Sequence, residues 1–536
     1  MKGFIKNYWS PIAASVVLLG IALYQYVAVV KINDGIFVYA LDDAYIHMAM
    51  AKNIVEHGVW GVTQYAFTAS SSSPLWTVLL SILYRVLGVQ TIIPYLLNCV
   101  FGVGVLCISA QILSRYILNK TIQFSFLMLL IVMVPLPIQI ISGMEHMMHI
   151  FLVLVFVSLC SKTIDQMNNE KQLDIRWKEL FFVTILMVLA RYESLFIVAA
   201  VVCILLVHKK IKEALMLLSA AIIPVVIVGI LYIVHGWYFL PNSILVKTRA
   251  AEETGIFSTF FHNIHQITTH AFEAQIIILL FLCLALALYA FQHREIIGTP
   301  FKSFLLWVVT VSTVLHLLFA RVGWLFRYEA YLIVIGLIAV CIIGDYSIKL
   351  KKTFFSGVFS GGMVGILLAV LFVPRIQVSL YAITAAPRNI YEQHYQLGRF
   401  MSKYYDNESI AATDIGAIAY YSGSNLVDLL GLADKAIGTA MIQSISLRDV
   451  TLARLREEQV SVAVAYTSYI ETVIATSDDS FPWIRVGGWE IVEANLLARH
   501  TVHFYAMRDD EVEILKESLR EFNPSLPPSV SAVIYN

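Results

Sequence analysis

An acidic pair, Asp42 and Asp43, opens the polar segment that carries the densest chemistry of the chain. From Ala44 to Val55, apolar residues recur at helical spacing ahead of Gly58, which predicts an amphipathic surface helix that this glycine ends. One aspartate is enough to cap such a helix, so the second carboxylate is left over. A spare carboxylate at a helix start is a candidate general base. We take Asp42 and Asp43 as alternative catalytic residues and place His47 in the binding site.

A serine-rich run comes next and reads Ser70-Ser-Ser-Ser73-Pro74-Leu-Trp76. Serine before proline is a strong helix start, with the serine as N-cap and the proline in the first turn. That local role accounts for one serine only, and the remaining hydroxyl and N–H groups could receive an anionic or hydroxyl-rich ligand. We therefore expect four residues of this run to line the donor or acceptor site: Ser71, Ser72, Ser73 and Trp76.

Basic residues lie at the ends of several apolar stretches: Arg191, Lys247, Arg249, Arg321 and Arg327. Any one of them could simply anchor a helix end at the membrane interface, with its apolar stem buried and its charge in water. As a group on one face of the membrane, they instead predict a set of cations that could bind an anionic group such as a phosphate. We assign the neighbouring polar residues Glu193 and Asn242 to donor or acceptor binding.

The sequence Glu145-His146-Met-Met-His149 invites comparison with a metal site. The zinc-protease pattern needs two histidines four residues apart with a glutamate between them, and that spacing is absent. Asp42, Asp43 and Glu145 could instead hold Mg²⁺ or Ca²⁺, which prefer carboxylate oxygens. We favour donor or acceptor binding for Glu145 and His146, and we expect that no metal or other cofactor is required.

The composition excludes an ordinary soluble enzyme. Of the 536 residues, 59% are hydrophobic and 14% are charged, and the mean hydropathy is +0.76. Soluble domains have about 25% charged residues. The 37 basic and 37 acidic residues cancel, which excludes a general attraction to nucleic acid. The sequence therefore predicts a polytopic membrane protein.

Residues 11–30 form the first stretch long enough to cross a bilayer, and they follow Lys2 and Lys6. Further candidates lie at residues 92–114, 121–142, 147–161, 178–190, 192–207, 214–234, 274–291, 303–319, 330–346 and 354–373. Together they predict about eleven transmembrane helices. The apolar stretch 74–87 is too short to cross and fits a juxtamembrane helix.

With that short helix outside the bilayer, the basic clusters of successive loops fall on the same side as the N-terminus. The positive-inside rule then predicts a cytoplasmic N-terminus, and it places the acidic pair and everything after residue 373 on the opposite side. We expect a bacterial inner-membrane protein whose C-terminal domain is periplasmic or extracellular.

The hydropathy changes character after residue 373. Short apolar strands are predicted at 409–413, 426–429, 460–465 and 501–507, with a charged helix at 448–458 between the second and the third. We predict a membrane module over residues 1–384 and a soluble α/β domain over 385–536. The proline-rich sequence that begins at Asn523 is predicted to be an extended tail.

Taken in order along nearly the whole chain, several motifs resemble the GT-C superfamily of membrane glycosyltransferases. The acidic pair and the Ser73-Pro74-Leu-Trp76 segment match the first external loop of that superfamily. The later matches are Ser142-Gly-Met-Glu145, Ala190-Arg-Tyr-Glu193, Leu240-Pro-Asn-Ser-Ile-Leu-Val-Lys247, Arg321-Val-Gly-Trp-Leu-Phe-Arg327-Tyr328, and Asp414-Ile-Gly-Ala-Ile-Ala-Tyr420 with Val427-Asp-Leu-Leu-Gly-Leu432. The chain departs at Tyr192, where proline is commoner, and in the serine run, where glycine, tyrosine and threonine are more usual.

The resemblance implies transfer of a sugar from a polyprenyl-phosphate donor with inversion at the anomeric carbon. The chain is similar to the arabinofuranosyltransferases and mannosyltransferase-like enzymes of bacteria. The resemblance therefore implies that the transferred sugar is a pentose such as arabinofuranose, or a hexose. The acceptor is a cell-surface glycan, a lipid-linked glycan or a protein, and the resemblance favours the first acidic position as the base. Two alternatives without catalysis are a lipid-linked-sugar transporter or flippase and a glycan-binding membrane protein. Transporters often show internal repeats and midplane charges, and neither feature is visible in the sequence.

Overall fold

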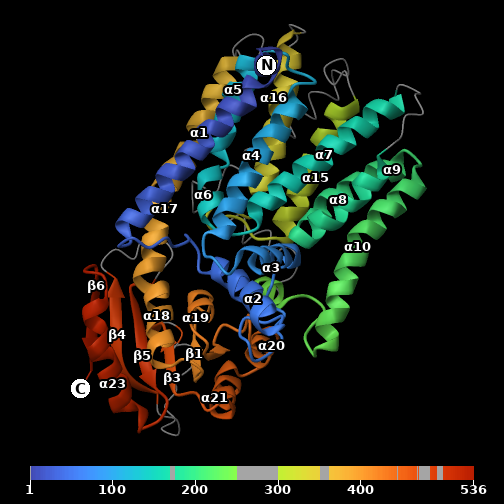
Figure 1. The fold of residues 1–536 in the computed structure, drawn as a ribbon. Coiled ribbons are helices and arrows are strands. Elements are labelled where there is room, and N and C mark those ends of the chain that lie inside the picture. Colours follow the sequence, from blue (N-terminus) through green and yellow to red (C-terminus); the bar gives the residue numbers. More distant parts are fainter. Residues whose placement is uncertain are drawn as a thin grey trace. The chain divides into compact units, whose positions relative to one another are not determined.

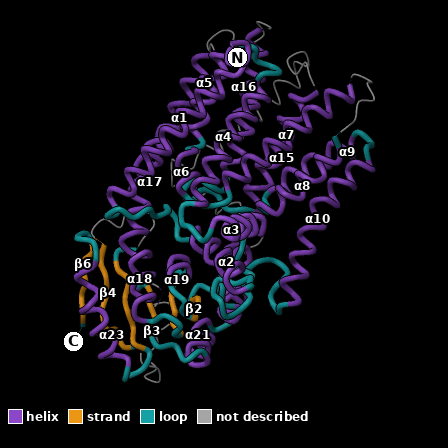
Figure 2. Tube along the Cα trace, viewed as in Figure 1, coloured by secondary structure: helices purple, strands orange, loops and turns teal. Residues whose placement is uncertain are grey.

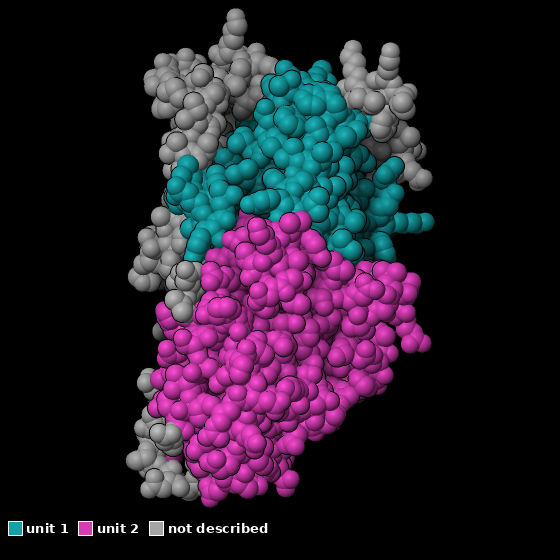
Figure 3. All heavy atoms as spheres, turned by 60° about the vertical axis from the view of Figure 1, so that its left-hand side comes forward, with its two compact units in different colours: residues 1–25, 95–227, 251–381 teal, residues 26–94, 228–250, 382–536 magenta. Residues whose placement is uncertain are grey.

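The computed structural model describes residues 2–168, 176–249, 300–349, 361–443, 445–467, 469, 483–491 and 499–535. The chain divides into two compact units, which Figure 3 colours teal and magenta. Unit 1 comprises residues 1–25, 95–227 and 251–381, and unit 2 comprises residues 26–94, 228–250 and 382–536. Unit 2 therefore combines the C-terminal region with the first polar loop and the segment around residue 240. The predicted division at residues 384/385 stays a prediction.

Several of the described helices are long and apolar enough to cross a membrane (Figure 1). They are residues 8–32 of α1 (Lys2–Ile32), α4 (Ile93–Leu113), residues 146–163 of α7 (His146–Asn168), α10 (Ile211–Val234) and α15 (Pro300–Phe319). Shorter apolar helices are α3 (Pro74–Leu87), α5 (Lys120–Met133), α9 (Ser194–Val207) and residues 330–343 of α16 (Ala330–Lys349). The protein is thus a multi-pass membrane protein, and the number of crossings stays a prediction.

The stretch 121–142, predicted to be one span, is interrupted. Helix α5 ends at Met133, and α6 (Leu136–Ile141) begins after Pro135. Two prolines, Pro135 and Pro137, lack the amide hydrogen that a continuous helix needs, so the helix breaks there. The predicted span 274–291 and the first part of 354–373 lie outside the described residues. The second of these continues as α17 (Gly361–Ile390).

The first polar loop of unit 2 carries the predicted surface helix. Helix α2 (Asp43–His57) ends at Gly58, whose φ of 71° is left-handed and whose amide donates to the carbonyls of Asn53 and Ile54. A left-handed residue at this position favours glycine, as the sequence predicted. Helix α3 has Pro74 in its first turn and packs against α2.

The C-terminal region contains a mixed sheet with the strand order β2-β1-β3-β5-β4-β6 (Figure 2). The strands are β1 (Ser409–Ala412), β2 (Asn425–Asp428), β3 (Val462–Ala465), β4 (Ile484–Ile491), β5 (Thr501–Ala506) and β6 (Val530–Ile534). Strand β1 pairs in parallel with β2 and β3, whereas the β3–β5, β5–β4 and β4–β6 pairs are antiparallel. Four strands were predicted, and β4 and β6 were missed.

Alternating side chains of this sheet form two separate cores. Ile410 and Ala412 face one core, which is completed by α18 (Gln396–Tyr404) and α23 (Glu511–Phe522). Ala411 faces the other core, with α20 (Lys435–Gln443) and α21 (Leu447–Glu457). The result is a three-layer α/β/α arrangement, because β1 and β3 bury side chains on both faces of the sheet.

The prediction of an extended tail was wrong. A 3₁₀ turn, η3 (Asn523–Ser525), follows α23, and the chain then returns as β6 to pair antiparallel with β4. The turn signal in the proline-rich sequence was correct, but it marks a connection between two ordered elements. Val530 at the start of β6 belongs to the core, which explains the return of the chain.

Candidate active site

Asp42 is the centre of a polar cluster in unit 2. Its Oδ2 accepts a hydrogen bond from the amide of Gly416 at 2.7 Å, and its Oδ1 accepts one from the amide of Ala417 at 2.8 Å. Asp42 precedes α2 with helical backbone angles, and its side chain makes no capping bond to that helix. The carboxylate therefore connects the first polar loop to Gly416 and Ala417, which lie more than 370 residues further along the chain.

The local fold around Gly416 explains why the connection forms. Strand β1 ends at Ala412, and α19 (Gly416–Tyr421) begins after a short turn, so its first amides are not used within the helix. A Cβ atom at residue 416 would collide with the backbone oxygen and the carboxylate of Asp42. Only glycine allows this close approach, and charge-assisted bonds of this kind are stronger than those between neutral groups.

A histidine and a second aspartate complete the cluster. The Nδ1 of His394 lies 3.3 Å from Oδ1 of Asp42, and the side chains of these residues are 4% and 11% exposed. Asp414 accepts a hydrogen bond from the hydroxyl of Tyr466. One ligand-type atom from each of Asp42, His394 and Asp414 lies within 4.8 Å of the others, so the described residues include one donor set that could hold a divalent cation.

The electrostatics of the cluster favour a protonated histidine. Burial lowers the pKa of His394, but the carboxylates of Asp42 and Asp414 raise it more strongly, and the result is about 9. Burial also raises the pKa of Asp414, which the imidazole of His394 opposes. The imidazolium supplies the positive charge that these carboxylates need in a buried setting.

The acidic pair was predicted from the sequence, whereas His394 was missed. His394 lies in a π-helical turn, η2 (Tyr391–Tyr395), and no spacing signal connects it with residue 42. The Asp414-Ile-Gly416 sequence was noted as a motif. Its glycine was the available signal that another segment, here Asp42, approaches this backbone closely. Asp43, the first residue of α2, is partly exposed.

The serine run has a largely structural environment. Ser71 Oγ lies 3.0 Å from Thr77 Oγ1 and 3.5 Å from Nδ1 of His47, and all three side chains are buried. Ser73 makes no capping bond to α3, and its backbone amide donates to Ser71 Oγ at 3.2 Å. Trp76 is fully buried, and Ser72 is partly exposed.

Asn242 connects three distant segments of unit 2. Its backbone N–H donates to the carbonyl of Ala69 at 3.0 Å, and its side-chain Nδ2 donates to the carbonyl of Gly431 at 2.9 Å. Ser70 Oγ donates to the adjacent carbonyl of Leu432 at 2.9 Å. The predicted cations Lys247 and Arg249 lie in α11 (Asn242–Arg249), and the structure describes their backbone only.

A second charged cluster lies in unit 1, around Arg191. Its Nη1 donates to Oε1 of Glu145 at 2.7 Å, and its Nε and Nη2 bind the two oxygens of Glu193. The guanidinium also lies over the ring of Tyr328, 5.5 Å from its centroid, and His146 contacts the same ring edge-on.

Arg327 occupies the turn that was predicted to bind phosphate. It is 2% exposed, its guanidinium lies 5.0 Å from the ring centroid of Tyr328, and its Nη2 donates to the Tyr328 hydroxyl at 3.2 Å. Arg321 is exposed, at the start of the same turn. Arg191 and Arg327 thus share one aromatic ring.

The turn itself is unusual in its backbone. Trp324, Leu325 and Phe326 have positive φ values of 46°, 60° and 62°, a conformation that such side chains rarely adopt. The carbonyl of Phe326 accepts from Nε2 of Gln139 at 2.9 Å and from Nη2 of Arg375 at 3.2 Å. These buried donors hold the turn in place.

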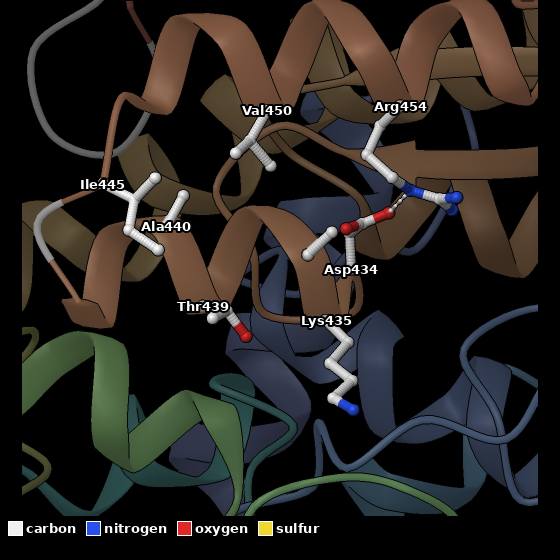
Figure 4. A pocket seen from close by; sticks show the side chains of 8 residues that line it. Asp434, Lys435, Thr439, Ala440, Ile445, Val450 and Arg454 are labelled. Atoms are coloured by element: carbon white, nitrogen blue, oxygen red, sulfur yellow. Dashed lines mark hydrogen bonds and ion pairs between the residues drawn. The ribbon is translucent and has the colours of Figure 1, made fainter.

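Unit 2 also contains a pocket of about 600 Å³ between α20 and α21 (Figure 4). Asp434 and Arg454 form an ion pair of 3.0 Å on its wall, and the side chain of Lys435 also lines it. Arg454 is further paired with Glu457 and Glu458. The pocket shares no residue with the Asp42 cluster, and two of its charged residues, Asp434 and Arg454, are paired with each other.

Comparisons with known proteins address the fold. Residues 388–514 match a family model described as a domain of unknown function, DUF8728. No curated protein matches the sequence. Among solved structures, the apo oligosaccharyltransferase of Archaeoglobus fulgidus aligns with a TM-score of 0.55 and 11% identity over 97% of this chain and 79% of its own.

The ArnT protein of Cupriavidus metallidurans is similar as well. Its apo structure aligns with a TM-score of 0.53 and 10% identity, and its structure with undecaprenyl phosphate aligns with a TM-score of 0.50 and 11% identity. Both alignments cover 92% of this chain and 98% of ArnT. At these identities the likeness concerns the fold. The chain shares the fold of these two proteins, with apolar helices and a sheet-containing C-terminal region, and this is the fold class that its motifs predicted.

Proposed function

We propose that the protein is an inverting glycosyltransferase that moves a sugar from a polyprenyl-phosphate donor to an acceptor outside the cytoplasm. The observation that carries the proposal is the acidic pair at the start of α2, one member of which is held by the amides of Gly416 and Ala417. The fold supports it, since ArnT, which aligns over most of this chain, binds undecaprenyl phosphate.

The reaction needs one base and several cations. An acceptor hydroxyl oxygen attacks the anomeric carbon, and the bond from that carbon to the phosphate oxygen breaks with its electron pair on the phosphate. The hydroxyl proton passes to a carboxylate of the acidic pair on the opposite face of the sugar, which gives inversion. Phosphate is a good leaving group, so no separate general acid is required.

Cations stabilise the phosphate as it gains negative charge. Arg327 is our first choice, because it lies in the predicted external turn whose aromatic side chains could lie against a polyprenyl chain. Lys247, Arg249 and Arg321 complete the proposed set. The polar residues that accompany these groups bind the donor or the acceptor in this proposal: His47, Ser71, Ser72, Ser73, Trp76, Glu145, His146, Glu193 and Asn242. The sugar, as a pentose such as arabinofuranose or a hexose, stays a prediction.

The test uses purified protein in lipid nanodiscs with radiolabelled polyprenyl-phosphate sugars. Release of polyprenyl phosphate, with sugar transferred to added acceptor or to water, supports the enzyme. A transporter would bind the donor, or move it across a liposome membrane, without cleaving it. Turnover with and without a chelator tests the expectation that no metal is required.

The membrane orientation belongs to the same proposal. We place the N-terminus in the cytoplasm of a bacterial cell and the C-terminal region in the periplasm, because the basic loops then lie inside. An alkaline phosphatase fused after Asn536 should be active in a bacterial host. Activity of a cytoplasmic reporter only, at the same junction, would refute this orientation.

A further inference from the structure

His394 and Asp414 have no part in the proposed transfer chemistry, although His394 contacts Asp42 and Asp414 lies close to both. His394 comes from a π-helical turn, which is a rare element that often occurs at functional sites. It is 4% exposed, and neither ring nitrogen has a hydrogen-bond partner of good geometry. Burying such a group is costly, so its position beside Asp42 calls for a physical reason.

The reason lies in the charges of the cluster. Asp42 and Asp414 are close to each other, and Asp43 adds a third carboxylate that acts on the same histidine. Carboxylates that share a buried site repel unless a cation lies between them. His394 lies in contact with one of these carboxylates, with its Nδ1 3.3 Å from Oδ1 of Asp42, and can supply that positive charge. The hydroxyl of Tyr466 satisfies Asp414 but carries no charge.

We propose that His394 is a positioning residue, which holds the Asp42 carboxylate on the amides of Gly416 and Ala417 and so keeps the acidic pair in its reactive geometry. Its effect on turnover rests on the proposed glycosyl transfer. Its effect on the Asp42 contacts does not, because those contacts exist without substrate. The histidine acts through Asp42 and does not touch the reacting atoms.

The first experiment measures hydrogen exchange on the full-length protein in nanodiscs. In the His394→Gln variant, peptides that cover residues 413–421 should gain up to two deuterons at early times, because two amides lose their acceptor. The matched control is His503→Gln, which changes a buried histidine of the same unit that bonds Thr467 at 2.8 Å. The control should leave residues 413–421 unchanged.

The second experiment measures kcat and KM for the donor. His394→Gln should lower kcat by about 10- to 100-fold, since small displacements of a catalytic group have effects of this size, while KM changes little. His394→Lys keeps a cation at this place and should recover part of both kcat and exchange protection. A merely structural histidine would lower the yield of folded protein without this rescue by charge.

The outcomes decide the proposal separately from the transfer reaction. Wild-type protection of residues 413–421 in the His394→Gln variant would overturn it. Loss of protection of residues 413–421 in the wild-type protein on adding a chelator would also overturn it, because a bound metal would then hold Asp42. If His394→Gln does not yield monodisperse protein, the lysine variant must still retain protection. If the wild type transfers no sugar but the exchange results hold, the proposed function fails and the positioning role stands.

Discussion

The two buried charge clusters use different cations, and this difference predicts different behaviour. Around Arg191 in unit 1, a guanidinium binds Glu145 and Glu193 through several nitrogens, and it keeps its charge at every accessible pH. Around Asp42 in unit 2, the cation is an imidazole with a pKa of about 9, and backbone amides provide the remaining donors. The first cluster is permanently charged, whereas the second can lose its cation to a change in pH.

The largest expected effect tests which cluster carries the chemistry. Asp43→Asn should lower kcat by about 10²- to 10⁴-fold, because removing a positioned base costs that much. Asp42→Asn should lower both kcat and the melting temperature, since the Nδ2 that replaces one carboxylate oxygen donates and cannot accept the amide hydrogen that this oxygen accepts. The measurements are kcat and thermal unfolding on monodisperse protein, with Asp449→Asn on the surface of α21 as control. Wild-type turnover in both variants would remove the base from this loop.

The next largest effect should be on stability in unit 1. Arg191→Met leaves the carboxylate of Glu145, which is fully buried, without its guanidinium. Removing one partner of a buried pair typically destabilises by about 3–5 kcal/mol. Denaturant unfolding of the variant in detergent should show a loss of this size, and Arg191→Lys should show a smaller one. An unchanged midpoint for Arg191→Met would mean that the pair contributes nothing.

A smaller effect is expected at the shared aromatic ring of unit 1. Arg327→Ala should lower kcat by at least about tenfold, or ~1.4 kcal/mol, because the cation acts more strongly on the departing phosphate than on the bound donor. Arg327→Lys should recover part of the loss, since the charge survives without the bidentate fork. Arg321→Ala, at the exposed start of the turn, is the comparison variant. A fall in folded yield with unchanged kcat would identify Arg327 as a structural anchor.

The smallest effect is the pH dependence that separates the clusters. The folded-state pKa of His394, about 9, exceeds its ordinary value near 6.5, so the stabilisation is fully present below pH 6.5 and is lost as the pH rises through about 9. The groups that face the imidazole are the carboxylates of Asp42, Asp414 and Asp43. The melting temperature of the wild type should therefore exceed that of His394→Gln by about 2–4 °C at pH 6 and converge with it near pH 10. A constant difference across this range would contradict the assignment.

Local patterns in the sequence predicted most of the elements. The 3.6-residue spacing and Gly58 predicted α2, because helix ends depend on neighbouring residues only. The strands β1, β2, β3 and β5 were recognised from short apolar runs. Strand β4 was missed, since its two adjacent glycines, Gly487 and Gly488, hide the apolar pattern. Strand β6 was missed because a proline-rich turn precedes it.

The sequence by itself determined the membrane-protein class, the helical fold and the position of the acidic pair at the start of a helix. Hydropathy, helix starts and motif order are local properties of the chain. Only the tertiary structure decided what surrounds that pair. Asp42 proved to accept hydrogen bonds from amides more than 370 residues away rather than to cap α2, and His394 supplied a cation that no spacing rule connects with it. Contacts of this kind depend on how distant segments pack. Hydrogen-bond satisfaction and charge compensation in a buried site are properties of the folded protein and not of any one segment.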